Sequence, residues 1–473
     1  MILHIARVLL IIFEVVVLFN LLIVVHELGH FLAARWRGLY IEGFGVWFGK
    51  PLWQKTINGV RYSLGSIPFG GFVKLPQLAP MDIIEGEADV DRAKLAPISA
   101  GDKIIVALAG PLFSFLLALA FACIVSVVGH PVGEADLTTT IGYVDKDAPA
   151  AMAGLQPGDR IRAVDGKPVQ RFAGMNDSVM WNVVRSEGTT IPFEVERGGK
   201  PLHFDVAPYK AEGRGWRRKS VRQVLISPAQ ASIADEISAN SPAAEAGMRK
   251  GDVVTKFNGM ALYSPLTLVD YIEQHPTSPV TLEVQRGATV LRPTMTPRLL
   301  AAGKDEKPHV GIRWDGAGRM SLAHPSPLEQ VYDSVVGTLN TIGAVVSTKS
   351  DVKLQHMTGP LGIFNLLYRL FAAEHGWQLA LWFSVILNVN LAILNMLPIP
   401  VLDGGHIVLA LVEAVRRRPV NTRVLEIIQT GCAAVIICYM LYITFFDVQD
   451  LPWVKHGLDK FEKHQSGKAE SEP

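Results

Sequence analysis

The stretch VLLIIFEVVVLFNLLIVVHELGHFLAA, residues 8–34, joins a membrane-length apolar run to an HExxH motif. If this stretch is helical, His26 and His30 project from one face, as two ligands of one metal ion must. Glu27 lies next to them, where its carboxylate can take a proton from a water molecule. Ionisable side chains near the end of a spanning helix are costly, so they predict a functional site in a polar interior. The alternative is a set of polar residues that snorkel at a helix end.

Length and composition indicate a membrane protein with a substantial soluble part. A chain of 473 residues is too long for one core, and its net charge of +1 gives no indication of nucleic-acid binding. Four segments are long and apolar enough to span a bilayer. We therefore expect a polytopic α-helical membrane protein with four transmembrane helices, at residues 9–34, 104–128, 379–397 and 427–446.

The three cysteines all fall inside these predicted spans and form no CxxC pair. We expect them to be small, buried apolar residues without a redox or metal role. They are Cys123, Cys432 and Cys438.

Basic residues predict the orientation of the chain in the membrane. The connection at residues 35–103 holds nine Lys or Arg, and residues 416–418 are three consecutive arginines after the third span. Both stretches belong on the cytoplasmic side by the positive-inside bias. The N-terminus, residues 130–377 and the C-terminal tail then lie outside the cytoplasm.

The external region contains an internal repeat. PAAMAGLQPGD at residues 149–159 matches PAAEAGMRKGD at residues 242–252, at an offset of 93 residues. Each copy continues with a strand-like run and a tight-turn dipeptide, Asp165-Gly166 and Asn258-Gly259. Two copies of a small β-rich domain are therefore expected. The pattern resembles the bacterial PDZ family, whose members bind extended peptide ends by adding a strand to a sheet edge. The alternative is a pair of β-modules without a ligand.

A catalytic metal site usually has three protein ligands, so a third ligand is needed. Glu42 is the nearest candidate along the chain, but a better one is Asp403 in the stretch LPIPVLDGGH, residues 397–406. Pro398 and Pro400 prevent a regular helix there, and the glycine pair after Asp403 permits a sharp excursion of the backbone. Because Asp403 follows a span that crosses in the same direction as the first, it reaches the same depth as the histidines. The alternative is an Asp-Gly turn after a span.

Taken together, these motifs make the chain resemble the site-2 proteases, the M50 intramembrane zinc metalloproteases, and most closely their regulator of sigma-E protease type. The resemblance covers nearly the whole chain. It rests on HELGH at 26–30, GGFVK at 70–74, AGP at 109–111, the tandem PDZ-like region, TGPLGI at 358–363 and LPIPVLDGGH at 397–406.

The resemblance implies a zinc-dependent intramembrane endopeptidase in which His26, His30 and Asp403 bind Zn²⁺ and Glu27 is the catalytic glutamate. Zinc rather than iron or cobalt is a preference based on ligand type. One departure is Ser114, since the family often carries Asn a few residues after this Gly-Pro. Any polar role at that position is therefore in doubt.

The resemblance also implies how substrate is held. Residues 66–75 alternate and turn like a β-hairpin, which in the family re-enters the membrane beside the site and can hold unwound substrate as an added strand. The alternative is a plain cytoplasmic hairpin. Further hydrogen bonds to substrate can come from two asparagines, for which simple helix packing is the alternative. The candidate substrate-binding residues are Gly70, Gly71, Phe72, Val73, Asn390 and Asn395.

The expected partners are single-span membrane proteins, with an anti-sigma factor as the main substrate and remnant signal peptides as a second class. PDZ domains in the periplasm then act as a size filter that admits proteins trimmed by another protease, and peptide ligands of these domains are further candidate partners. The expected place is the bacterial inner membrane, in contact with the lipid bilayer and without nucleic acid. Two rivals are a catalytically silent PDZ membrane scaffold, which needs no HExxH, and a lipid desaturase, which needs more histidine clusters.

The expected domain order follows from these observations. It starts with the first transmembrane helix at 1–34, a cytoplasmic-side segment with a membrane-associated hairpin at 35–103 and the second helix at 104–129. PDZ domains at 130–212 and 220–300 and amphipathic external helices at 320–376 come next. The third helix with its LDG motif at 377–405, a cytoplasmic amphipathic segment at 406–424, the fourth helix at 425–447 and a tail at 448–473 complete the chain.

Overall fold

The computed structural model describes residues 2–78, 95–211, 217–299, 307–418, 420–452 and 454–455. The charged end of the tail, residues 456–473, for which the composition predicts disorder, lies outside these residues. The chain divides into two compact units. The first, here called the membrane unit, comprises residues 1–130, 324–340 and 355–473, and the second, the β-rich unit, comprises residues 131–323 and 341–354.

Within the described residues, four helices of the membrane unit are long and apolar enough to cross a bilayer. They match the four predicted segments, although the first begins seven residues earlier than predicted, since residues 2–8 continue the helix despite His4 and Arg7. At 1.5 Å per residue this helix is about 54 Å long, more than a bilayer core requires. The four helices are α1 (Ile2–Arg37), α3 (Ala100–Val128), α10 (Gly376–Asn395) and α12 (Thr422–Gln449).

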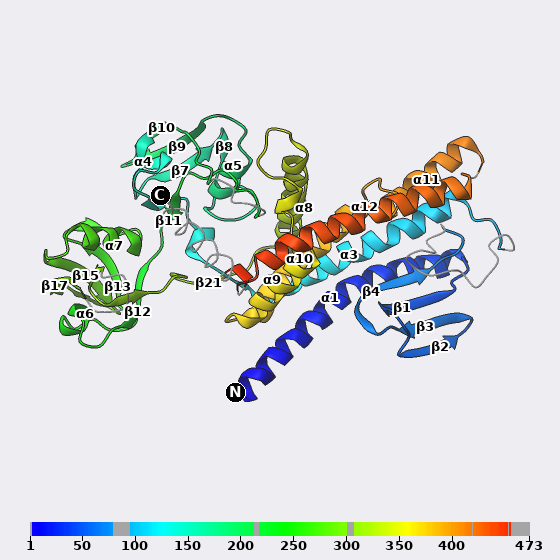
Figure 1. The fold of residues 1–473 in the computed structure, drawn as a ribbon, viewed down its shortest axis with the longest axis horizontal. Coiled ribbons are helices and arrows are strands. Elements are labelled where there is room, and N and C mark those ends of the chain that lie inside the picture. The colour runs from blue at the N-terminus through cyan, green and yellow to red at the C-terminus, as the bar shows by residue number, and fades with distance from the viewer. Residues whose placement is uncertain are drawn as a thin grey trace, which may run out of the picture. The chain divides into compact units, whose positions relative to one another are not determined.

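Helices α1 and α10 both pack along α3, which makes α3 the centre of the membrane unit (Figure 1). Apolar side chains of these helices form its core, among them Leu22, Ala118 and Val385. The burial expected for the cysteines is wrong for two of them, since the side chains of Cys123 and Cys438 are exposed. The outer face of a spanning helix contacts lipid, where an apolar side chain is at no disadvantage.

A four-stranded sheet follows α1 in the order β2-β3-β1-β4, with β4 packed against α1 (Figure 1). The hairpin expected at residues 66–75 is wrong, because those residues form one strand that pairs antiparallel with β1. Gly70 has a φ of +85° yet lies inside the strand. The Gly-Gly pair therefore introduces an irregularity into one continuous strand and does not reverse the direction of the chain. The strands are β1 (Gly43–Phe48), β2 (Trp53–Ile57), β3 (Val60–Leu64) and β4 (Ile67–Lys74).

Shorter helices complete the membrane unit. The amphipathic helices expected after the β-rich region are present as α8 (Pro327–Val346), which begins in the membrane unit, and α9 (Pro360–Ala372). Between them lies the 3₁₀ turn η3 (Leu354–His356). Helix α11 (Asp403–Arg416) begins with the aspartate of the LDG motif and packs against α3.

The β-rich unit contains two copies of one module. In each, a short helix with proline at its start leads into the strand and tight turn that the repeat predicted, and a second helix, which the repeat did not predict, follows. The first copy holds β6 (Ile141–Val144), α4 (Pro149–Ala153), β7 (Arg160–Val164), β8 (Lys167–Pro168), α5 (Val179–Arg185), β9 (Ile191–Arg197), β10 (Lys200–Val206) and β11 (Ile226–Pro228). It is preceded by β5 (His130–Val132) and η2 (Glu134–Asp136).

The second copy has its own core and sheet, in the order β16-β15-β13-β12-β20. Its elements are β12 (Ser232–Ile237), α6 (Pro242–Glu245), β13 (Val253–Phe257), β14 (Met260–Ala261), α7 (Pro265–Gln274), β15 (Val280–Arg286), β16 (Thr289–Leu291), β17 (Thr294–Met295), β18 (Arg298–Leu299), β19 (Pro308–His309) and β20 (Ile312–Trp314). Strand β21 (Ser321–Ala323) then pairs with β5.

The boundaries of both copies differ from those expected. Strand β11, placed in the second domain from sequence, pairs with β6 of the first copy, and Val224 belongs to the first core. Likewise β20, beyond the expected end at residue 300, pairs with β12 of the second copy. In both copies a strand distant in sequence closes the sheet, which local patterning does not indicate.

A buried ion pair is repeated in the two copies at the motif's final aspartate. Arg197 donates to both carboxylate oxygens of Asp159 at 2.6 and 2.7 Å, and Arg286 binds Asp252 in the same way at 2.7 Å. Both aspartates are 1% exposed. The final Asp of each Gly-Asp motif therefore fixes the loop before the next strand.

Candidate metal centre

Helix α1 presents the two histidines of the HExxH motif on one face, as the i, i+4 spacing requires. Their Nε2 atoms are 3.3 Å apart and both side chains are buried. Asp403 reaches the same point from α11. Its Oδ2 lies 3.2 Å from Nε2 of His26, and its Oδ1 lies 3.2 Å from Nε2 of His30.

Asp403 owes its position to the two glycines that follow it. A Cβ on Gly404 would lie 2.2 Å from the carbonyl oxygen of Met396, and one on Gly405 would lie 2.1 Å from that of Ile399. The glycine pair was expected to allow an unusual backbone excursion. Instead both residues are helical, and they let the start of α11 pack directly against the preceding irregular chain.

Each histidine ring makes a hydrogen bond through Nδ1, on the side of the ring away from the candidate metal position. Nδ1 of His30 is 2.8 Å from the carbonyl oxygen of Val106, and Nδ1 of His26 is 3.0 Å from Oγ of Ser114. A carbonyl oxygen can only accept, so Nδ1 of His30 carries the proton and its Nε2 presents a lone pair to the centre.

These atoms fit a divalent metal ion. The three candidate ligand atoms lie within 4.8 Å of one another, and they form the one such His, Cys, Asp or Glu group among the described residues. Asp403 Oδ2 is buried without a hydrogen-bond donor. The Nε2 lone pair of His30 and the Asp403 carboxylate converge without a proton between them, so they repel one another unless a cation lies between them. Two nitrogen ligands and one oxygen ligand leave a coordination position open, as catalytic sites do.

Close packing of α1 on α3 brings these groups together. A Cβ on Gly29 would lie 2.4 Å from the carbonyl oxygen of Ala109, and a Cβ on Gly110 would lie 2.2 Å from Nε2 of His30. Only glycine allows the two helices to approach this closely. The Ala-Gly-Pro motif at residues 109–111 therefore forms one wall of the site.

The glutamate of the motif, Glu27, faces strand β4. Its carboxylate accepts a hydrogen bond from the backbone of Val73, and a Cβ on Gly71 would lie 3.4 Å from Glu27 Cγ. Phe72, between them, stacks instead on Phe48 at 6.2 Å. Strand β4 is an edge strand of its sheet, so the strand next to the candidate catalytic base has one side without a strand partner among the described residues.

Of the remaining residues predicted for the site, one lies beside the metal ligands and others bond elsewhere. Asn395 lies at the centre, with Nδ2 3.4 Å from Nε2 of His26. Asn390, by contrast, accepts a hydrogen bond from Thr338 on α8. Glu42, the alternative third ligand, is ion-paired with Lys74 at 4.0 Å and is not part of the ligand group. Sequence reasoning gave Ser114 no role, although the structure places its hydroxyl against a ligand.

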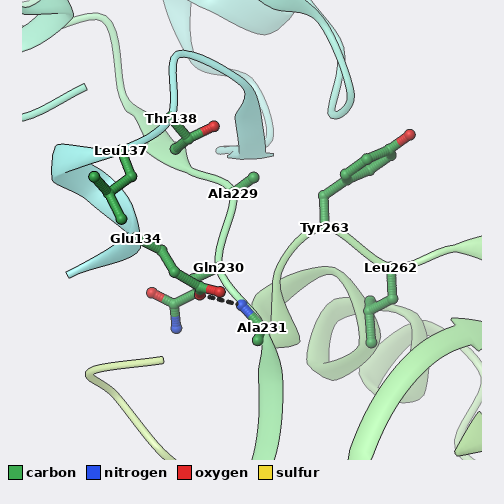
Figure 2. A pocket seen from close by; sticks show the side chains of 8 residues that line it. All are labelled: Glu134, Leu137, Thr138, Ala229, Gln230, Ala231, Leu262 and Tyr263. Atoms are coloured by element: carbon green, nitrogen blue, oxygen red, sulfur yellow. Dashed lines mark hydrogen bonds between the residues drawn. The ribbon is translucent and has the colours of Figure 1, made fainter. Parts of the chain in front are cut away.

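A shallow pocket of about 320 Å³ lies in the β-rich unit. Figure 2 shows its lining, where an oxygen of Glu134 accepts a hydrogen bond of 2.5 Å from the backbone of Ala231. Tyr263 projects from the second copy into the same space. With its single carboxylate already bonded, the pocket has no set of groups suited to hydrolysis.

Comparison with known proteins agrees with the chemistry of the metal centre. The regulator of sigma-E protease RseP of Escherichia coli is 28% identical to this chain over 436 residues, covering 86% of this chain and 92% of the relative. A putative zinc metalloprotease of Vibrio cholerae is 29% identical over 461 residues, covering 91% and 97%. The PDZ domain of an SdrC-like protein from Listeria monocytogenes aligns with 19% of this chain and 90% of its own, at 21% identity and a TM-score of 0.17, too low to support an argument.

The sequence model described as "Peptidase family M50" matches residues 14–439, nearly the whole chain, including the HExxH helix and the LDG motif. The chain therefore belongs to peptidase family M50.

Proposed function

We propose that this protein is a zinc-dependent intramembrane endopeptidase with His26, His30 and Asp403 as the metal ligands and Glu27 as the catalytic base. The observation that carries the proposal is the convergence of three ligand atoms from two distant parts of the chain, beside a glutamate, at the end of a membrane-length helix. Relatives named zinc metalloproteases support zinc as the metal.

The chemistry divides between the metal and the chain. A bound zinc ion acts as a Lewis acid and lowers the pKa of water to about 7. Glu27 then accepts the proton of the attacking water and returns it to the leaving amine. The Val73 backbone hydrogen bond holds the Glu27 carboxylate in place for both transfers. Asn395 has its amide nitrogen 3.4 Å from the ligand His26, where it is able to donate a hydrogen bond to the carbonyl oxygen of substrate.

A helical substrate must unwind locally before it is cut, because its carbonyls are engaged in its own hydrogen bonds. Strand β4 offers backbone groups along residues 70–73 as a template for the unwound segment. Gly71 leaves the space beside Glu27 open to substrate, since a Cβ there would already contact the Glu27 side chain, 3.4 Å from its Cγ. When substrate adds to the sheet as a fifth strand, its helix is unwound and its peptide bonds are placed beside Glu27.

We further propose that the two β-rich copies are PDZ domains on the periplasmic side of a bacterial inner membrane, and that they exclude substrates with bulky external domains. Single-span proteins trimmed by another protease, and remnant signal peptides, are then the substrates. Relatives called regulators of sigma-E protease support an anti-sigma factor as one of them. Four helices able to span a bilayer and nine basic residues in the first connection support this placement.

A pair of reporters tests this proposal. Each has the same single transmembrane segment, and one carries a short external tail while the other carries a folded external domain. In cells without an M50 protease of their own, this protein should cleave the short reporter and spare the long one. Cleavage that persists in an Asp403→Asn variant contradicts the assignment of Asp403 as a metal ligand. Equal cleavage of both reporters by the parent contradicts the size filter.

A further inference from the structure

The hydroxyl of Ser114 contacts the ring of His26 on the side away from the metal centre, with Oγ 3.0 Å from Nδ1. Ser114 is on α3, 88 residues from His26, and is 0% exposed. We propose that Ser114 is a positioning residue: it accepts the Nδ1 proton of His26 and thereby presents the Nε2 lone pair to the metal. This inference rests on the proposed metal site.

The two histidines differ in how firmly their tautomers are set. The partner of His30 is a backbone carbonyl oxygen, which mutation cannot remove and which only accepts. The partner of His26 is a hydroxyl, a group that is lost by a single substitution. The ligand geometry of His26 therefore depends on one side chain.

Burial makes this contact hard to replace. Ser114 and His26 are 0% and 7% exposed, so bulk water does not reach Nδ1 when the hydroxyl is removed. Without an acceptor at Nδ1, no hydrogen bond stabilises the tautomer of His26 that carries its proton on Nδ1. The other tautomer, with its proton on Nε2, directs a hydrogen atom at the metal position and cannot bind the metal there. Loss of the outer partner of a metal-ligating histidine typically weakens metal binding 10- to 100-fold.

Close helix packing sets the length that this residue can have. Gly29 on α1 and Gly110 on α3 let the two helices approach so closely that a Cβ on either residue would clash with the other helix. Gly110 lies about one helical turn before Ser114. At this separation the short serine side chain already spans the gap to Nδ1.

The test compares zinc affinity in the purified full-length protein, by competition with a chromophoric chelator, for the parent, Ser114→Ala, Ser114→Thr and Ser384→Ala. Ser384 is the matched control, because it is also 0% exposed on a packed transmembrane helix but donates to the Ala380 carbonyl oxygen. We expect Ser114→Ala to bind zinc 10- to 100-fold more weakly, Ser114→Thr to retain affinity, and Ser384→Ala to match the parent. The absorption spectrum of the Co²⁺-loaded protein should shift in Ser114→Ala alone.

The outcomes separate this inference from the proposed function. Zinc affinity in Ser114→Ala within twofold of the parent overturns the role of Ser114 and leaves the metal site intact. Equal weakening in Ser384→Ala or in Ser114→Thr also overturns it, because packing would then explain the effect. If the parent itself binds no zinc, the proposed function fails and the inference fails with it.

Discussion

Substitution of Gly110 by alanine tests the close packing on which the metal centre depends. The added Cβ would lie 2.2 Å from Nε2 of His30, 2.5 Å from its Cε1 and 2.8 Å from its Cδ2. Ordinary contact begins near 3.4 Å, so the ring or α3 must move by about 1.2 Å. The ring cannot give way freely, because Nδ1 is bonded to the Val106 carbonyl oxygen on the same helix.

A displacement of this size at a reacting centre is worth about 100-fold in rate, and the overpacking costs about 1–3 kcal/mol of stability. We therefore expect Gly110→Ala to cleave the short reporter at about 1% of the parent rate and to bind zinc more weakly. Rates are measured at equal protein abundance by quantitative immunoblotting of reporter fragments.

The matched control is Gly101→Ala at the start of the same helix, where the nearest atom to an added Cβ is Ser99 Oγ at 3.7 Å. Alanine is the better helix former, so this variant should be fully active and at least as stable as the parent. A Gly110→Ala protein with parental cleavage and zinc affinity would refute the packing argument.

Three further predictions concern other parts of the molecule. Removal of zinc with 1,10-phenanthroline should abolish cleavage of the short reporter, and added Zn²⁺ should restore it. Cleavage by fully metal-free protein would contradict a metal-dependent step. Asp351→Ala should destabilise the β-rich unit by about 2 kcal/mol, because it removes the carboxylate partner of buried Arg222 at 3.0 Å and leaves the bond to the Gly188 carbonyl oxygen. Hydrogen exchange at α5, which ends shortly before Gly188, should then accelerate, and exchange unchanged from the parent would count against this. Burial opposes ionisation of Asp252, but the Arg286 guanidinium and the Arg249 backbone hold the pKa of Asp252 below its ordinary value. Its contribution to stability is therefore present above about pH 4 and lost below it. The protection of β12 and β13, measured as hydrogen exchange relative to the intrinsic rate at each pH, should fall on acidification, and it should fall less in Asp252→Asn.

Sequence periodicity predicted the elements that local patterning controls. The apolar runs predicted four membrane-length helices, and the 93-residue offset predicted two similar modules. The depth argument also predicted that Asp403 arrives beside His26 and His30, because two spans crossing in one direction end at one boundary. These conclusions depend on helix geometry, which the chain specifies locally.

What the sequence did not reveal depends on contacts between distant segments. Gly70 and Gly71 looked like a turn, but the edge of β1 holds them in a strand. The contact between Ser114 and His26 depends on the register of α3 on α1, which is set by Gly29 and Gly110. Strands β11 and β20 join sheets formed from residues far earlier in the chain. Tertiary pairing of this kind has no local signature.

Glu27 is the proposed carrier of the proton in an intramembrane hydrolysis, and cleavage of the short reporter by the parent and by Glu27→Gln measures this role. The substitution keeps the size of the side chain and removes its ability to accept a proton. At equal abundance and equal zinc content, the parent should cleave and Glu27→Gln should not. Cleavage by Glu27→Gln at the parental rate would show that Glu27 is not the base of this hydrolysis.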